Sequence, residues 1–420
     1  MTYAQTIQYL YHAAPLFQNI GADAYKEGLS NTLTLDEHFG HPHRSYVTIH
    51  VAGTNGKGSV SSTLAAILQS AGYRVGLYTS PHLIDFRERI RVNGRMIPKQ
   101  RVIRFVQEER SFFEPLHPSF FELTTALAFK YFEEAKVDVA VIEVGLGGRL
   151  DCTNIITPAV SVITNISFDH TQFLGNTLPQ IAAEKAGIIK PHVPVVIGEA
   201  PDPDVHEVFM RVAAQQEAPI RFADEAQWPP IQGQLTGLYQ QKNAATIQCV
   251  ISVLSEAAQP LFHIPDEALH NGFLHVHELT GLSGRWQKLH TSPDVICDAG
   301  HNVGGIQYVA RQLQQQECTA LRIVIGMVSD KDIRGVLSLM PHHAIYYFTQ
   351  PSCARAMPAE TLATTASELG LRGCVFNDVA AACRQALADA APTDFIFVGG
   401  SCYVVADLLA SWKAKNSSFS

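Results

Sequence analysis

Charged side chains are scarce in this sequence, and long apolar runs are absent. Asp, Glu, Lys and Arg make up 17% of the 420 residues, whereas about 25% is usual in soluble proteins. The shortfall predicts broad buried strands and many uncharged helices. Because no stretch of about 18 apolar residues occurs, we expect no membrane-spanning helix.

Basic residues are outnumbered by acidic ones. The chain has 31 Lys and Arg against 39 Asp and Glu, which leaves a formal net charge of −8. Proteins that bind nucleic acid present a basic surface, so we expect no nucleic-acid partner. A local phosphate site is still compatible with this charge.

Paired cysteine motifs are also missing. No two of the eight cysteines have C-x-x-C spacing, which argues against a zinc ribbon and a thioredoxin-like site. Scattered single thiols are typical of buried small residues in a reducing compartment. The first 17 residues lack a basic region before their apolar residues, so we expect no secretory signal and a cytoplasmic protein.

The sequence does contain ample material for folded cores. Hydrophobic residues reach 46%, which argues against disorder, and 420 residues favour two or three domains. Apolar β-branched runs alternate with helical patterns, which indicates a doubly wound, mostly parallel α/β sheet. The runs in the first half are 46–52, 137–144, 160–166 and 194–197.

A second α/β series follows, and we expect it to form a smaller Rossmann-like domain. Its expected strands are 294–299, 321–327, 344–349 and 394–398. Between the two series lie a loop at 224–234, a helix at 240–256, and a break near 287–293. We therefore predict an ATP-binding P-loop domain at 1–288 and a C-terminal domain at 289–420, each long enough for a core.

The strongest signal is a glycine-rich segment between the first expected strand and a helix. GTNGKGS at 53–59 lets backbone N–H groups point at one centre, at the positive end of the helix dipole. Lys57 supplies a cation for phosphates, and Ser59 a hydroxyl for Mg²⁺. Gly58 separates the two, unlike the usual pattern G-x-x-x-x-G-K-[ST]. The alternative is a glycine-rich turn without a ligand, which the order of strand, lysine and helix disfavours.

Several long motifs together resemble the folylpolyglutamate synthase/dihydrofolate synthase family of the Mur ligase superfamily. In the first domain they are VAGTNGKGS (51–59), TSPHLIDFRERIRVNG (79–94), EVGLGGRLDCTN (143–154), FDHTQFLG (168–175) and EKAGIIK (184–190). In the second half they are NAATI (243–247), SGRWQ (283–287), DAGHN (298–302) and SDKD (329–332). They occur in order over nearly the whole chain.

The resemblance implies an ATP-dependent ligase that adds L-glutamate to dihydropteroate, to the glutamate tail of reduced folates, or to both. ATP would phosphorylate a carboxylate, and the amino group of glutamate would attack the acyl phosphate. Such a reaction joins anions, so it depends on cations, metal and positioning. From the same resemblance we expect a monomer with small-molecule substrates.

The resemblance also assigns the metal and the catalytic residues. Ser80, Glu143 and His170 would hold Mg²⁺, with a second ion as an option. Ser80 and His170 follow expected strands and Glu143 ends another, which is where open α/β sheets bind ligands. Taken alone, Ser80 before Pro81 is most often a turn residue, Glu143 could cap a loop, and His170 could be a hydrogen-bonding histidine. Lys185 stands where related ligases often carry a carbamylated lysine, whereas spacing alone favours an ordinary surface lysine.

The nucleotide and the pterin sites are likewise implied by the family. ATP would contact the phosphate loop and three further residues, where Arg285 suits bidentate phosphate binding, and His301 would be a catalytic residue of the cleft. The nucleotide set is Asn55, Gly56, Lys57, Gly58, Ser59, Asn243, Arg285 and Asp298. Tyr239 and DAGHN depart from the family's usual His and DGAHN, yet Asn243, Asp298 and His301 are in place. Their positions on both sides of the expected boundary imply a site that domain movement closes.

The expected substrate residues include SFFE at 119–122, in which two aromatic rings could stack on a flat ring. As an alternative, either ring could be an ordinary core aromatic at a helix start. The set is Gly28, Leu29, Ser119, Phe120, Phe121, Glu122, Leu150, Asp151 and Cys152. Cys152 stands where alanine is common, and we assign it no reactivity.

Other functions compete with the ligase. A P-loop phosphotransferase would explain GTNGKGS but not the second domain with DAGHN. A non-catalytic nucleotide sensor would be expected to lack Lys57, Glu143 or His170, all of which are present. A peptidoglycan-precursor ligase is a near neighbour rather than a separate class, and the TSPHL–ERI segment and SFFE favour the folate branch.

Overall fold

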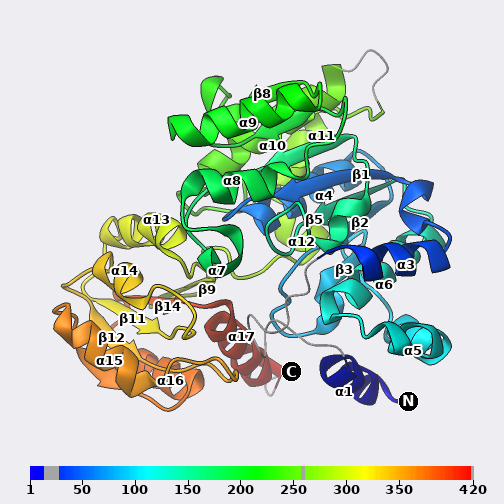
Figure 1. Cartoon of the computed structure of the whole chain (residues 1–420). Helices are drawn as coiled ribbons and strands as arrows, with labels where there is room; N and C mark the ends of the chain where they lie inside the picture. Colours follow the sequence, from blue (N-terminus) through cyan, green and yellow to red (C-terminus); the bar gives the residue numbers. More distant parts are fainter. Residues whose placement is uncertain (14–27, 257–260, 418–420) are drawn as a thin grey trace. The chain divides into compact units, whose positions relative to one another are not determined.

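The computed structural model describes residues 1–13, 28–256 and 261–417 (Figure 1). Contacts divide the chain into two compact units. Unit 1 comprises Met1–Gln234 and Gln240–Leu282, and unit 2 comprises Leu235–Tyr239 and Ser283–Ser420. This division lies a few residues before the boundary expected after residue 288. The last four residues of the 17-residue segment that we examined for a secretory signal lie outside the described residues.

Unit 1 is built on an eight-stranded sheet in the order β4-β3-β2-β5-β1-β6-β7-β8. Strands β3 and β4 pair antiparallel with their neighbours, and the other pairs are parallel. The strands are β1 Val47–Ala52, β2 Val75–Tyr78, β3 Ile90–Val92, β4 Arg95–Met96, β5 Val139–Glu143, β6 Val160–Ile163, β7 Val195–Ile197 and β8 Ile220–Phe222. Short buried runs of β-branched residues explain the central strands, since a parallel sheet is covered on both faces.

Side chains alternate between the two faces of this sheet. In β5, Val139 and Val141 join one apolar cluster, whereas Ala140 and Ile142 join another. The first cluster includes side chains of α4, α10 and α11, whereas α5 and α6 supply much of the second. In a third cluster, α8 and α9 pack against β6 and β7. The helices of unit 1 are α1 Tyr3–Ala13, α3 Ser30–His38, α4 Lys57–Ser70, α5 Lys99–Phe113, α6 Phe120–Glu134, α7 Thr171–Leu174, α8 Leu178–Ala186, α9 Pro203–Gln215, α10 Gln240–Glu256, α11 Asp266–Leu274 and α12 Val276–Thr280.

Unit 2 has a six-stranded sheet in the order β13-β12-β11-β14-β10-β9. The strands are β9 Gln287–Thr291, β10 Asp294–Asp298, β11 Leu321–Ile325, β12 Ile345–Phe348, β13 Gly373–Val375 and β14 Phe395–Gly399. The helices are α13 Val303–Gln314, α14 Ile333–Ser338, α15 Ala359–Glu368, α16 Val379–Asp389 and α17 Cys402–Ser417. The segment that we expected to be a break is strand β9, which pairs antiparallel with β10.

The fold class expected from the sequence is confirmed, with two mostly parallel α/β sheets. No disulfide joins any two of the eight cysteines, all of which lie within the described ranges. Over the described ranges, no helix combines the length and the apolar character that crossing a bilayer requires.

Candidate active site

The phosphate loop leaves the carboxyl end of β1 and enters α4 at Lys57. Gly53 and Gly56 have φ of 141° and 84°, which side-chain-bearing residues rarely adopt. A Cβ on Gly53 would lie 1.9 Å from Thr164 Oγ1, and one on Gly56 would lie 2.4 Å from Asn243 Oδ1. The Lys57 ammonium donates to the carbonyls of Gly53 and Thr54 at 3.1 and 3.2 Å. The loop is therefore a tight curl with its lysine folded over it.

A polar segment after β6 holds the first half of this loop. Thr54 N–H donates to the Asn165 carbonyl at 2.9 Å, and Asn55 N–H donates to Asn165 Oδ1 at 3.0 Å. The Thr164 hydroxyl donates to the Asn55 carbonyl at 2.6 Å. The sequence analysis did not select Thr164 or Asn165, although polar residues directly after an apolar strand are a signal that could have found them.

Helix α10 holds the second half of the loop. Gln240 Nε2 donates to Ser59 Oγ at 3.1 Å, and Gln240 Oε1 accepts a hydrogen bond from Asn243 Nδ2 at 2.8 Å. Ser59 and Asn243 are both buried. The structure thus places Asn243, which the resemblance assigns to ATP, beside the phosphate loop, and adds Gln240 as a residue that the sequence analysis missed.

Lys185 lies at the end of α8 and is only 3% exposed. Its ammonium donates to the Gly53 carbonyl at 3.0 Å, the same oxygen that accepts from Lys57. Burial, assisted by the nearby Lys57 charge, lowers the pKa of Lys185 to about 7, while Asp169 and Asp151 oppose the shift. The interpretation of Lys185 as an ordinary surface lysine is therefore wrong, because two lysines converge on one carbonyl inside the fold.

The depressed pKa of Lys185 predicts how stability depends on pH. Below pH 7 the lysine is charged in both states, and the cost of burying that charge is fully present. Between pH 7 and the unfolded pKa near 10.5 only the unfolded state binds the proton, so stability rises with pH. Lys185→Met removes this dependence. From pH 7 to 9, wild type should gain about 2 kcal/mol over Lys185→Met, measured by urea unfolding in CO₂-free buffer. An equal pH response in both proteins would contradict the depressed pKa.

The expected metal residues lie at the carboxyl ends of unit 1 strands. Ser80 N–H donates to Glu143 Oε2 at 3.0 Å, so the loop after β2 meets the end of β5. Glu143 is 3% exposed. His170 lies in the segment after β6 and directly precedes α7, with a φ of 50°. The described ranges contain no group of three or more His, Cys, Asp or Glu side chains arranged to hold a metal.

These residues nevertheless fit a magnesium ion that shares its coordination with phosphates. Mg²⁺ keeps several waters and takes one or two carboxylates together with substrate phosphate oxygens. Glu143 supplies a buried carboxylate beside Ser80. Its strand ends next to the phosphate loop, because Glu143 is in register with Val51 near the carboxyl end of β1. The donor set is therefore compatible with the predicted ion.

The SFFE segment begins helix α6 and divides into structural and exposed residues. Ser119 and Glu122 form a capping box, in which each side chain accepts the other's backbone N–H. The Phe120 ring is 2% exposed and packs 5.7 Å from the Phe86 ring. Phe121 is only partly buried, and its ring lies 5.8 Å from that of Tyr78. Phe121 is thus the residue of this segment whose ring a flat ligand could reach.

The remaining substrate-side residues follow two loops. Gly28 and Leu29 are half-buried and directly precede α3. Leu150 is also half-buried, whereas Asp151 is 5% exposed. Burial raises the pKa of the Cys152 thiol well above its usual range, which agrees with assigning that thiol no reactivity.

In unit 2, Asp298 ends β10 and is buried. Its Oδ2 accepts hydrogen bonds from Trp286 N–H at 2.7 Å and from the Tyr239 hydroxyl at 2.5 Å, and its Oδ1 accepts from Gly300 N–H at 2.7 Å. His301 Nδ1 donates to the Ala299 carbonyl at 3.0 Å. Arg285, which we expected in the first domain, belongs to unit 2. Tyr239 thus orients Asp298, a role that the sequence did not indicate.

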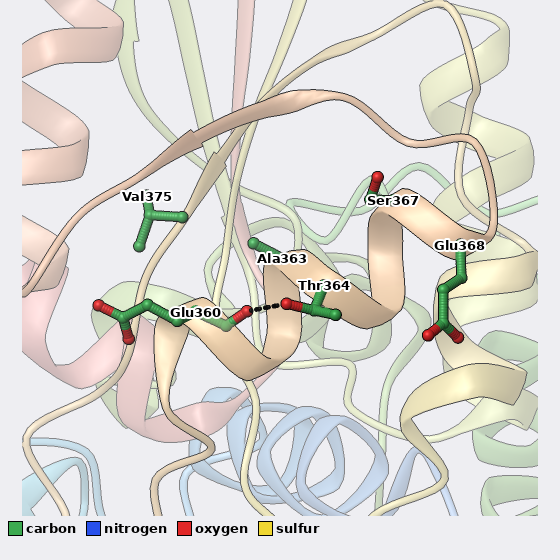
Figure 2. A pocket seen from close by; sticks show the side chains of 6 residues that line it. All are labelled: Glu360, Ala363, Thr364, Ser367, Glu368 and Val375. Atoms are coloured by element: carbon green, nitrogen blue, oxygen red, sulfur yellow. Dashed lines mark hydrogen bonds between the residues drawn. The ribbon is translucent and has the colours of Figure 1, made fainter.

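Unit 2 also carries an open surface depression of ≈ 560 Å³ between α15 and β13 (Figure 2). Its lining residues are Glu360, Ala363, Thr364, Ser367, Glu368 and Val375. The Thr364 hydroxyl is already bonded to the Glu360 carbonyl of its own helix. None of the predicted site residues lines this depression.

Comparison with known proteins agrees with this geometry. Residues 51–245 match the Mur ligase middle domain, and residues 284–402 match the Mur ligase glutamate ligase domain. The dihydrofolate synthase/folylpolyglutamate synthase of Escherichia coli is 34% identical over 383 residues, which cover 87% of each chain. A solved bifunctional folylpolyglutamate synthase/dihydrofolate synthase with Mn, AMPPNP and L-glutamate bound superposes with a TM-score of 0.84 at 32% identity, covering 98% of each chain.

A longer relative is also similar. A probable bifunctional folylpolyglutamate synthase/dihydropteroate synthase of Haloferax volcanii is 35% identical over 418 residues, which cover 92% of this chain. The chain spans 48% of the length of that relative.

Two α/β units, a strand–GTNGKGS–helix phosphate loop and both domain matches define an ATP-dependent ligase of the Mur type. Within that class, the chain belongs to the folylpolyglutamate synthase/dihydrofolate synthase family.

Proposed function

We propose that this chain adds L-glutamate to dihydropteroate, to the glutamate tail of reduced folates, or to both, with hydrolysis of ATP to ADP and phosphate. The observation that carries the proposal is the convergence of Lys57 and buried Lys185 on the Gly53 carbonyl of the phosphate loop. The Lys57 cation suits a reaction whose charge develops on a transferring phosphoryl group, and Lys185 is placed to act on the same turn of backbone.

The reaction has two stages. A carboxylate oxygen of the acceptor attacks the γ-phosphorus of ATP, and the bond to the ADP oxygen breaks, which leaves an acyl phosphate. The amino group of glutamate then attacks the acyl carbon, phosphate leaves with the bonding pair, and the amine gives up a proton. Lys57 and the N–H groups of the loop orient the phosphates in the first stage.

The chain's own residues suit the metal and the nucleotide. Ser80, Glu143 and His170 would hold Mg²⁺, which neutralises phosphate charge when bound. Asn243 and residues 55–59 would bind ATP in unit 1. The roles that the family resemblance gives to Arg285, Asp298 and His301 are also part of the proposal.

Carbamylation of Lys185 is a further part of the proposal. Only the neutral amine attacks CO₂, and a pKa of about 7 leaves a large neutral fraction at physiological pH. The product is a carbamate anion and a released proton. An anion at this position would relieve the repulsion between Lys185 and Lys57, which now share one acceptor.

Phe121 would stack on the pterin ring. Phe121→Leu should raise the KM of the pterin substrate by about threefold to tenfold because it removes an aromatic face worth about 0.5–1.5 kcal/mol. The KM of ATP and the melting temperature should stay close to wild type. Phe120→Leu is the matched control and should lower the melting temperature instead, since Phe120 lies in the core. Steady-state kinetics and thermal unfolding distinguish the two, and an unchanged pterin KM in Phe121→Leu would argue against stacking.

The decisive assay measures ADP release with dihydropteroate and with tetrahydrofolate, each with and without L-glutamate. We expect ADP release that requires glutamate with at least one of the two acceptors. ADP release that does not depend on glutamate would support a phosphotransferase, and ADP release with neither acceptor would favour the neighbouring peptidoglycan-precursor branch of Mur ligases.

The setting of the enzyme follows from the same residues. Eight cysteines without a disulfide suit a reducing compartment, and we place the enzyme in the cytoplasm. A net charge of −8 suits small-molecule substrates better than a nucleic acid. One chain carries every predicted site residue, so a monomer would suffice for catalysis.

A further inference from the structure

A buried histidine lies in the central strand of unit 1 without a role in the chemistry above. His50 is in β1, three residues before Gly53, and its side chain is 0% exposed. Its Nε2 lies 2.8 Å from Thr153 Oγ1. Its Nδ1 is buried and has no hydrogen-bond partner within the described ranges. Burial, with a contribution from Lys190, lowers the pKa of His50 to about 3, so the ring is neutral at physiological pH.

The partners of Thr153 settle the direction of the hydrogen bonds. Thr153 Oγ1 lies 2.5 Å from Asp151 Oδ1, which also accepts the backbone N–H of Thr153 at 3.0 Å. Asp151 Oδ2 accepts from Gly145 N–H at 3.0 Å and from Leu146 N–H at 2.9 Å. Burial raises the pKa of Asp151, and the three backbone N–H donors oppose this shift because they favour the ionised form, which can only accept. The Thr153 hydroxyl therefore donates to Asp151, and His50 must donate its Nε2–H to Thr153.

This arrangement is poorly suited to stability alone. An aliphatic side chain, as at the neighbouring Ile49 and Val51, would fill the strand interior without burying an unpartnered nitrogen, which costs folding stability. Thr153 would keep its bond to Asp151 without His50. The hydrogen bond from Nε2 is thus the feature that distinguishes histidine from an aliphatic residue at this position.

The other end of the chain of hydrogen bonds reaches the candidate site. Gly145 and Leu146, which Asp151 binds, lie two and three residues after the candidate metal ligand Glu143. The same loop continues to Arg149, whose backbone N–H donates to the Glu184 carbonyl at 2.8 Å, next to Lys185. His50 itself lies on the strand that leads into the phosphate loop.

We propose that His50 is a positioning residue which, through Thr153 and Asp151, holds the loop at 145–151 in register with the phosphate loop. The loop at 145–151 carries candidate residues for the carboxylate substrate, and the phosphate loop would hold ATP, which donates the phosphoryl group. The network therefore sets the distance between the reacting groups. The inference rests on the proposed ligase function, because its effect is measured on that reaction.

The test begins with His50→Leu. It should lower kcat by between about 10-fold and 100-fold, since small misplacements of reacting groups have effects of this size. The KM of ATP should stay within about twofold, because residues 53–59 and Lys57 are unchanged. The melting temperature should be equal to or above that of wild type. A kcat equal to that of wild type would overturn the proposal.

Two conservative variants separate positioning from packing. His50→Gln can place an amide N–H near the position of Nε2 and should recover most of the lost kcat. Thr153→Val should reproduce the loss, and Thr153→Ser, which keeps the hydroxyl, should not. Should His50→Leu fail to fold, these three variants decide the question, and equal kcat values for Thr153→Val and Thr153→Ser would overturn the proposal.

A matched control lies on the adjacent strand. Ser161 of β6 is in register with His50, and its hydroxyl donates to the Ile188 carbonyl at 2.8 Å, outside the network. Ser161→Ala should change the melting temperature but not kcat. A kcat loss in Ser161→Ala as large as that in His50→Leu would show a general packing effect and refute positioning.

The proton on the ring can be observed independently of activity. In protein labelled with ¹⁵N-histidine, the NMR signals of His50, assigned by their loss in His50→Gln, should show a protonated Nε2 and a bare Nδ1. A protonated Nδ1 would overturn the proposal. If wild type releases no glutamate-dependent ADP while the expected tautomer is seen, the proposed function fails and the hydrogen-bond network is still established.

Discussion

Replacing Lys57 by alanine should lower kcat for glutamate-dependent ADP release by about 10²- to 10³-fold, the usual effect of losing one preorganised charge that faces a transferring group. The Lys57 ammonium lies over the Gly53 and Thr54 carbonyls at the start of the loop. Its removal leaves the glycine curl, the bonds to Asn165 and helix α4 in place, so the fold should persist. Steady-state kinetics with saturating ATP, together with thermal unfolding, measure both effects.

The control for Lys57 is a basic residue on an exposed helix face. Arg104 pairs with Glu108 within α5, and both side chains are at least half exposed. Arg104→Ala should leave kcat unchanged, because an exposed pair of this kind contributes little. A folded Lys57→Ala protein with near-normal turnover would show that GTNGKGS is not the catalytic phosphate loop.

Much of the fold could be predicted because its strands are short, apolar and β-branched. The helix expected at 240–256 has the same bounds as α10, and the strand expected at 294–299 is β10 within one residue. Strand β9 escaped prediction since Gln287–Thr291 is polar and largely exposed at a sheet edge. Edge strands carry little hydrophobic pattern, and only their pairing reveals them.

The candidate site was predictable where chemistry and local pattern coincide. The phosphate loop needs glycine where its backbone has a positive φ, so the GTNGKGS motif was enough to locate the loop in the sequence. The burial of Lys185 did not, because spacing on α8 is compatible with a surface lysine. Its environment depends on Gly53, which is 132 residues away in the chain.

The contacts that support the candidate site residues could not be predicted from the sequence for the same reason. Gln240 and Ser59, or His50 and Thr153, are 181 and 103 residues apart. Single polar residues in a helix or a strand have ordinary roles far more often than special ones. Only the fold brings these residues together, because the sheet places β1, β5 and β6 side by side and α10 contacts α4.

Replacing Lys185 by alanine should lower kcat by about 10²-fold, and the way the loss is rescued identifies the active form of the lysine. If Lys185 acts as a carbamate, formate or acetate should restore part of the activity by placing a carboxylate in the vacated space. If it acts as an ammonium, methylamine or ethylamine should do so instead. We expect rescue by carboxylates, because the ammonium form is disfavoured by burial and by Lys57.

Lys190 provides the matched control for this rescue. It lies five residues further along the same segment, burial also lowers its pKa, and its ammonium donates to the Asn154 carbonyl rather than to the phosphate loop. Lys190→Ala should show no rescue by either class of compound. In wild type incubated with ¹³C-bicarbonate, a carbamate NMR signal should appear that Lys185→Ala lacks and Lys190→Ala retains. Rescue of Lys185→Ala by amines alone, with no carbamate signal in wild type, would show that the unmodified lysine is the functional group, because only a cation would then replace what the mutation removes.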